Sequence, residues 1–199
     1  ARQSFLFTTY VAEAPFVSWV VLKKRPPAKA FAGGFLALSG IGLIAGNGAG
    51  DIRLGDFITL SSSLLFTLQI VFVGKYMKKN MDIFVFSFIQ FSAAALLSLL
   101  LLSLQGGPFL PSGSECVEGV LFLGILNTAA AFTLQNGAQK YLPDVTVSLI
   151  SSMESVFGFL FSCLYYGNPV TPSFLAGGAL CFAAIVLNGV GNKTIDDRG

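Results

Sequence analysis

Long apolar runs alternate with short polar joints along the whole chain. A window of about 19 residues, enough to cross a hydrocarbon core of about 30 Å, finds seven such runs. They cover residues 4–22, 28–46, 57–76, 82–104, 117–135, 147–166 and 171–190. The joints are rich in proline, glycine and charged residues, which is typical of turns. The pattern predicts an all-α, polytopic membrane helix bundle with seven transmembrane helices.

Composition supports a membrane protein and excludes several other classes. Of the 199 residues, 54% are hydrophobic and only 11% are charged, which is more apolar sequence than a soluble core of this size could hide. Soluble enzymes, disordered tails and secreted disulfide scaffolds are therefore excluded. The lipid bilayer is the main predicted partner, and nothing in the sequence points to nucleic acid.

The chemistry open to the chain is narrow because it contains no histidine. Histidine supplies most general bases near neutral pH and most zinc and haem sites. The three cysteines, Cys116, Cys163 and Cys181, have no paired spacing and are interpreted as packing residues. We therefore expect no metal site, no cofactor and no catalytic residues.

The positive charges are unevenly distributed between the two sets of joints. If the first joint is cytoplasmic, ten of the twelve Lys and Arg residues lie on that side, and only Arg2 and Arg53 lie on the other. The ten are Lys23, Lys24, Arg25, Lys29, Lys75, Lys78, Lys79, Lys140, Lys193 and Arg198. The sequence thus predicts a multi-pass protein of the cell membrane with an external N-terminus and a cytoplasmic tail over residues 193–199.

The start of the sequence is unlike that of a complete membrane protein. It begins with Ala1 and enters an apolar run within three residues, without Met or a signal-peptide n-region. A signal peptide is the alternative for residues 4–22, but the segment is too long and contains Glu13 and Pro15. We expect the chain to be a fragment that lacks helices upstream.

Two hairpins resemble each other. Ala32-Gly33-Gly34 opens the second predicted helix and Ala176-Gly177-Gly178 opens the seventh, each after a proline turn and a helix that contains one Glu. Five helix steps separate the hairpins, so copies would point in opposite directions across the bilayer, as in an inverted repeat. The alternative is that the paired glycines only allow close helix packing. Gly33, Gly34, Gly177 and Gly178 are predicted packing positions in both interpretations.

Several motifs occur in a familiar order. They are Tyr10-Val11 with Pro15 and Ser18-Trp19, Lys23-Lys24-Arg25-Pro26, Leu54-Gly55-Asp56, Gly74-Lys75-Tyr76, Asn127-Thr128-Ala129, Gln135-Asn136-Gly137-Ala138-Gln139-Lys140-Tyr141, Met153-Glu154-Ser155-Val156-Phe157-Gly158 and Leu175-Ala176-Gly177-Gly178-Ala179-Leu180. Together they resemble the EamA-type ten-helix branch of the drug/metabolite transporter superfamily. The resemblance implies a 5+5 inverted repeat, with the last two helices of the first unit in 1–50 and a complete second unit in 51–192. The family often has Glu-Pro at Glu154-Ser155 and Glu at Asn168.

Six strongly polar residues within the predicted spans are the candidates for a functional role. A charged group at the bilayer centre costs on the order of 2.5 to 3.5 kcal/mol on insertion scales, so such groups normally face protein or water. The six are Glu13, Gln69, Gln90, Asn127, Gln135 and Glu154. In one interpretation they line a substrate cavity walled by the first and the third to sixth helices, and the two carboxylates bind substrate or carry protons. In the other they join helices without binding a solute.

These features predict a secondary transporter, or permease, that moves a small metabolite or drug-like solute by alternating access. The sequence has no phosphate-binding loop for ATP, so a gradient would supply the energy, with protons as the candidate coupling ion. A seven-helix receptor is one alternative. An intramembrane enzyme is another, with Glu154 activating a neighbouring serine. The sequence indicates neither the substrate nor the oligomeric state.

Overall fold

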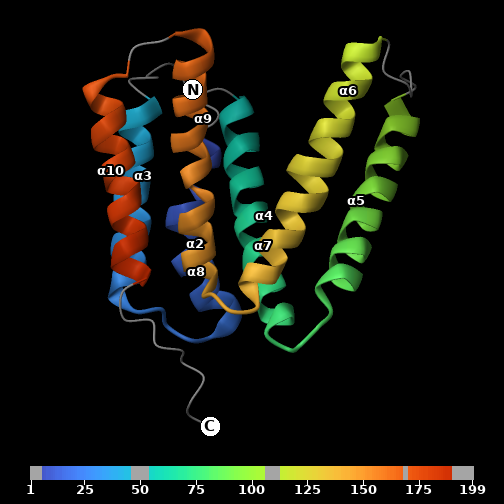
Figure 1. Ribbon diagram of the computed structural model, residues 1–199. Coiled ribbons are helices and arrows are strands. Elements are labelled where there is room, and N and C mark those ends of the chain that lie inside the picture. Colours follow the sequence, from blue (N-terminus) through green and yellow to red (C-terminus); the bar gives the residue numbers. More distant parts are fainter. Residues whose placement is uncertain (1–5, 46–53, 106–112, 168–169, 190–199) are drawn as a thin grey trace. The chain divides into compact units, whose positions relative to one another are not determined.

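The computed structural model describes residues 6–45, 54–105, 113–167 and 170–189, and every regular element in these ranges is a helix (Figure 1). The elements are α2 (Tyr10–Leu22), α3 (Ala28–Ala45), α4 (Leu54–Met77), α5 (Ile83–Gln105), α6 (Ser114–Phe122), η1 (Leu123–Ala130), α7 (Ala131–Gln139), α8 (Asp144–Ser151), α9 (Met153–Tyr166) and α10 (Pro172–Gly189). Arg2, Asp51, Arg53, Asn168, the boundary between residues 50 and 51, and the tail 193–199 lie outside the described residues.

The helices form seven segments, as the apolar runs predicted. The first of two composite segments joins α6, the π-helical stretch η1 and α7 without a break, and the second joins α8 and α9 with only Ser152 between them. Four segments are long and apolar enough to cross a membrane: Leu54–Met77, Ile83–Leu104, Cys116–Gln139 and Asp144–Tyr166. The other three, α2, α3 and α10, are shorter apolar helices. The chain is therefore an all-α, multi-pass membrane protein.

The largest differences from the predicted boundaries occur at two places. The first run was expected to be one helix over residues 4–22, but α2 begins at Tyr10 after a turn at Thr8 and Thr9. Residues 136–146 were expected to be a joint, but helix continues through Gln139 and resumes at Asp144. Pro143, which is extended at φ −62° and ψ 145°, needs no amide hydrogen there, so α8 can begin directly after it.

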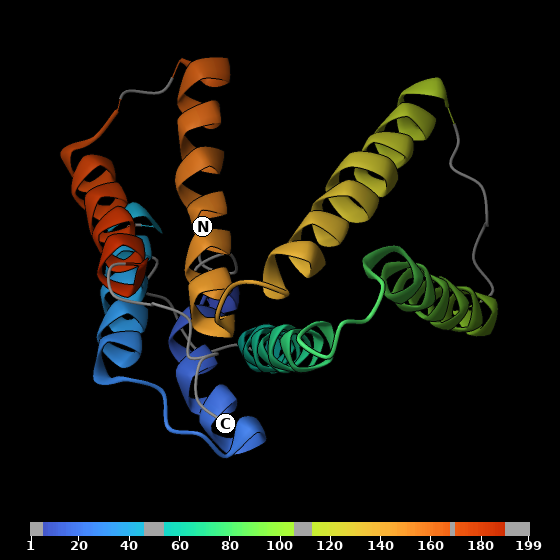
Figure 2. The same ribbon diagram turned by 60° about the horizontal axis from the view of Figure 1, so that its bottom comes forward.

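The described residues divide into two compact units. One contains the residues up to Phe72 together with those from Leu142 onward, and the other contains Val73–Tyr141. In the first unit α3 and α10 lie side by side, as Figures 1 and 2 both show. In the second unit α5 packs against α7. The π-helical stretch η1 has no buried residue.

Glycines bring α3 and α10 into backbone contact. A Cβ atom added to Gly40 would lie 2.5 Å from the Gly177 carbonyl oxygen and 2.9 Å from Cys181 Sγ, too close for any side chain. The Cys181 thiol donates to the Ala37 carbonyl oxygen at 3.6 Å. In lipid, where no hydrophobic driving force acts between helices, close packing at small residues is one of the sources of helix association.

The same contact runs antiparallel along the two helices. Near the start of α3, a Cβ on Gly33 would overlap the Asn188 side chain at the end of α10. Near the start of α10, a Cβ on Gly177 would lie 2.7 Å from Ile44 Cγ1 at the end of α3. The loop between α2 and α3 and the turn between α9 and α10 therefore lie at opposite ends of this unit (Figure 1).

The hairpins α2–α3 and α9–α10 correspond at a constant spacing of 144 positions, as their numbering shows. α3 and α10 begin and end at equivalent positions, as do the ends of α2 and α9. Each of these ends is followed by a left-handed residue, Lys23 in one hairpin and Gly167 in the other. The turn at Thr8 is matched by the irregular residue Ser152. One contact is repeated as well: Gly33 contacts Asn188, and their equivalents at this spacing, Gly177 and Ile44, also contact each other.

Candidate functional site

The Glu13 carboxylate in α2 is held by hydroxyl groups. Thr9 and Ser63 each donate to Glu13 Oε1, at 3.0 Å and 3.2 Å, and Thr67 donates to Oε2 at 3.1 Å. Ser63 and Thr67 are fully buried one turn apart on α4, whereas Glu13 is half-buried. Among the described residues, the hydrogen bonds to this carboxylate come from hydroxyl groups and not from a lysine or arginine. We call Thr9, Glu13, Ser63 and Thr67 the hydroxyl cluster.

The hydroxyl cluster has more short oxygen–oxygen contacts than hydroxyl protons. Besides the three bonds to Glu13, Thr9 Oγ1 lies 2.7 Å from the Leu6 carbonyl oxygen and 2.9 Å from Ser63 Oγ. Thr67 Oγ1 also lies 3.0 Å from the Ser63 carbonyl oxygen and 3.4 Å from the Tyr10 carbonyl oxygen. Each hydroxyl has one proton to donate, so three protons serve these seven contacts. When all three hydroxyls donate to Glu13, no proton remains between Thr9 and Ser63.

The sequence places this cluster beside a weak point in the helix. The turn at Thr8 and Thr9 precedes α2, and Pro15 inside α2 removes the amide hydrogen that would bond the Val11 carbonyl oxygen. That oxygen faces α3, where a Cβ on Gly34 would lie 3.0 Å from it. Gly34 therefore lets α3 approach the interrupted part of α2. Tyr10 closes the other side, with its ring 5.0 Å from that of Phe66 on α4.

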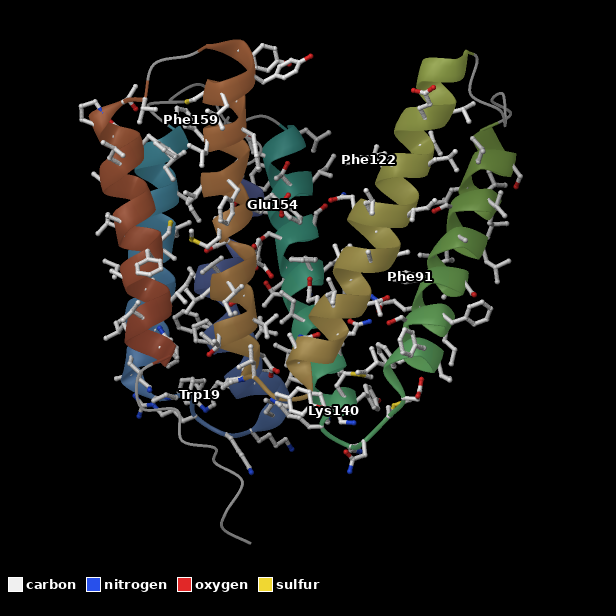
Figure 3. The ribbon with its side chains drawn as sticks, in the orientation of Figure 1. Trp19, Phe91, Phe122, Lys140, Glu154 and Phe159 are labelled. Atoms are coloured by element: carbon white, nitrogen blue, oxygen red, sulfur yellow. The ribbon has the colours of Figure 1, made fainter. Side chains whose placement is uncertain are left out.

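Glu154 lies elsewhere in the same unit and is exposed. Val156, about 200° away on the helix, contacts α10 at Gly178, so Glu154 leaves α9 on the flank away from α10 (Figure 3). The same figure shows Phe159 toward α10, where its ring stacks 4.5 Å from that of Phe174. At the spacing of 144 positions, Glu154 is the equivalent of Tyr10, which is buried. Gln69, also in this unit, is half-buried.

The other three predicted residues belong to the second unit. Gln90 Oε1 accepts a hydrogen bond of 3.1 Å from Asn136 Nδ2, which also donates to Ser87 Oγ at 2.9 Å. These bonds join α5 to α7, as expected of residues that hold helices together. Asn127 is exposed within η1, and Gln135 is half-buried. The structure therefore distributes the six predicted residues over two units.

The sequence analysis did not select four residues that the structure makes prominent: Thr9, Ser63, Thr67 and Asn136. Asn136 is fully buried, and its Oδ1 atom has no hydrogen-bond partner among the described residues. The signal for the hydroxyl cluster was a pair of four-residue spacings, Thr9 to Glu13 and Ser63 to Thr67, which place each pair on one helix face. Within the described ranges, no three Asp, Glu, Cys or His side chains lie close enough to hold a metal ion.

The helices and their composition define a multi-pass α-helical membrane protein, and comparison with known proteins identifies its family. Residues 53–190 match the EamA-like transporter family, and this chain belongs to that family. The resemblance to EamA-type drug/metabolite transporters is thereby confirmed, and it points to transport rather than catalysis. The chain is also 27% identical over 183 residues to an uncharacterized transporter of Archaeoglobus fulgidus, covering 92% of this chain and 58% of that protein. It thus spans less than two thirds of that relative's length.

Proposed function

We propose that this protein is a secondary transporter that moves a small metabolite or drug-like solute across the cell membrane by alternating access. The family supports transport, and the correspondence between the two hairpins supports the mechanism. In transporters built from inverted repeats, two units of opposite direction rock against each other around a central site. The proposal accounts for both the family match and the antiparallel contact between the two hairpins.

The observation that carries the proposal is the symmetry of the α3–α10 contact. A twofold axis between Ala37 and Cys181, which are themselves 144 positions apart, exchanges the Gly33–Asn188 contact with the Gly177–Ile44 contact. The same axis exchanges the contact of Gly40 with Gly177 and the contact of Gly33 with Ala184. Such a contact is isologous, like the interface of a twofold dimer. We infer that residues 1–50 contribute the last two helices of one five-helix unit and residues 51–192 form the other. The family match over residues 53–190 supports this division.

Glu13 is the residue we propose for proton coupling. A proton on Glu13 would give the hydroxyl cluster a fourth donor. Glu13 could then donate to Ser63, Ser63 to Thr9, and Thr9 to the Leu6 carbonyl oxygen, while Thr67 continues to donate to Glu13 Oε2. The cluster can therefore be hydrogen-bonded with or without this proton.

Solute-driven proton movement tests the transport proposal. The full-length protein is reconstituted in liposomes that contain a pH-sensitive dye, and gradients of alanine, glucose or tetraethylammonium are imposed one at a time. We expect at least one gradient to change the internal pH, and Glu13→Gln to abolish that change. Glu118→Gln, which removes an exposed carboxylate of α6, should leave it intact. Solute-driven proton movement that persists in Glu13→Gln would exclude Glu13 as the carrier.

The inverted arrangement can be tested without a substrate. In a variant that lacks the native cysteines, Lys24→Cys and Val170→Cys place single thiols in the joints at opposite ends of the first unit. We expect a membrane-impermeant maleimide added to intact cells to label Val170→Cys but not Lys24→Cys, because the basic joint is cytoplasmic. Labelling of both from the same side would contradict the inverted arrangement.

A further inference from the structure

The turn that ends α2 is built on a residue poorly suited to its backbone conformation. Lys23 has φ 54° and ψ 18°, in the left-handed region that side chains with a Cβ atom disfavour. Glycine is the usual residue at such a helix end because it adopts this conformation without a steric penalty. A lysine at this position therefore requires a reason beyond the turn itself.

The second hairpin provides an internal comparison. Gly167 ends α9 at the equivalent position with φ 68° and ψ 18°, so the two hairpins end the helix with the same left-handed backbone. The sequence continues as Lys24-Arg25-Pro26 after Lys23, but as Asn168-Pro169-Val170 after Gly167. Of these two turns, the basic one therefore contains the strained residue. Residues held in strained backbone conformations cluster at active sites, ligand clamps and switch regions.

Trp19 places the basic turn at a membrane surface. The Arg25 guanidinium carbon lies 5.4 Å from the centre of the Trp19 ring, which is a cation–π contact. Trp19 is 44% exposed on the last turns of α2, beside the loop (Figure 3). Tryptophan near a helix end normally lies at the level of the lipid headgroups. Lys23, Lys24 and Arg25 are all exposed there.

We propose that Lys23, Lys24 and Arg25, with Trp19, form a binding site for the headgroup phosphate of an anionic phospholipid. The asymmetric distribution of basic residues between membrane sides requires charge near the helix end, but not a lysine in the left-handed position. Lys24 and Arg25 would already meet that requirement. The additional cation at Lys23 brings a third positive group to the same turn, while Trp19 keeps the guanidinium of Arg25 at headgroup depth. A lipid phosphate fits this arrangement, and the inference does not depend on transport.

Lys23→Gly is the decisive variant because the proposal predicts opposite effects on lipid binding and stability. The probe is phosphatidylglycerol added to the protein in neutral detergent, with retained lipid measured by native mass spectrometry. Each basic residue near an anionic surface contributes about fivefold in affinity, so we expect about fivefold weaker binding. The same variant should unfold about 2–4 °C higher in lipid-free detergent, because glycine relieves the strain.

Four controls make the result specific. Arg25→Gln leaves the backbone of the turn unchanged and should also weaken phosphatidylglycerol binding about fivefold. Lys140→Gln removes a positive charge from another joint and should have no such effect. Phosphatidylcholine should bind equally to all variants, and inorganic phosphate at the same concentration should not displace phosphatidylglycerol.

Four results would overturn the proposal. Unchanged phosphatidylglycerol binding in Lys23→Gly or Arg25→Gln would exclude the site. An equal loss in Lys140→Gln would show a general effect of surface charge. Displacement by inorganic phosphate would indicate a soluble anion as the ligand. A Lys23→Gly protein less stable in lipid-free detergent would show that Lys23 serves to cap the helix.

Discussion

The glycine contact between α3 and α10 leads to a quantitative prediction. In Gly40→Ala the new methyl group would lie 2.5 Å from the Gly177 carbonyl oxygen, whereas ordinary contacts of this kind are 3.4–4 Å. The obstacle is backbone, so the helices must separate by about 1 Å locally. Overpacking of this kind costs about 1–3 kcal/mol. Alanine recovers about 0.5–1 kcal/mol through its higher helix propensity. Subtracting this gain from the overpacking cost leaves a net loss of up to about 2.5 kcal/mol.

Gly158→Ala is the matched control for this prediction. It is the same substitution inside α9, but an added Cβ at Gly158 meets no atom within 4 Å in the described structure. It should therefore leave stability unchanged or raise it by up to about 1 kcal/mol. Heat-induced unfolding in neutral detergent, followed by circular dichroism, measures both variants. If Gly40→Ala is as stable as Gly158→Ala, the close contact between α3 and α10 does not exist in the protein.

A double variant shows whether Gly40 and Gly177 meet at one point. Each new methyl group would separate the same two backbones, because each glycine lies against the carbonyl oxygen of the other. Once the helices have moved apart for the first substitution, the second costs less. We expect the combined loss to fall short of the sum of the single losses by at least about 0.5 kcal/mol. Additive losses would indicate two separate contacts.

Three further substitutions test individual side chains. Gly33→Ala should cost less than substitutions that meet backbone, because its main obstacle is the movable Asn188 side chain, and the same unfolding assay compares them. Thr67→Val removes the hydrogen bond to Glu13 and should lower the free energy of unfolding by about 1–3 kcal/mol. Its control is Ser62→Ala, which removes only a hydrogen bond within α4 and should change that free energy by less than about 0.5 kcal/mol. Urea unfolding measures both variants. Asn136→Leu removes two hydrogen bonds between α7 and α5, so these helices should open more often. The expected result is faster amide hydrogen exchange in both helices.

The helices could be predicted well from the sequence, because lipid requires long apolar runs and the joints contain proline, glycine and charge. The ends were less predictable. Pro143 reads as the middle of a loop, yet it directly precedes α8. The turn at Thr8 and Thr9 contains neither proline nor glycine, the residues from which a turn is usually predicted. Threonine is common inside membrane helices, so only its packing against α4 distinguishes this position.

The buried face of α4 could not be predicted, because its apolar residues surround the helix. The sequence analysis gave weight to Gln69 on this helix. The structure buries Ser63 and Thr67, and it exposes Ser62, one residue and about 100° away. Lipid and protein are equally apolar, so hydrophobic periodicity carries little information about which side faces a neighbour. The buried face of α4 becomes apparent only from its contacts in the structure, where Ser63 and Thr67 donate hydrogen bonds to Glu13 on α2.

Cys181 gives the protein an intrinsic reporter of helix separation. Its thiol is fully buried between α3 and α10, where it donates to the backbone carbonyl oxygen of Ala37. A small alkylating reagent can reach this sulfur only when α3 and α10 part, and its reaction rate then measures how often they do. Cys116 is exposed and would react at once, which supplies an internal reference. A solute that changes the reaction rate at Cys181 would therefore show that the contact between α3 and α10 opens when the solute binds. An unchanged rate would show that these two helices stay together.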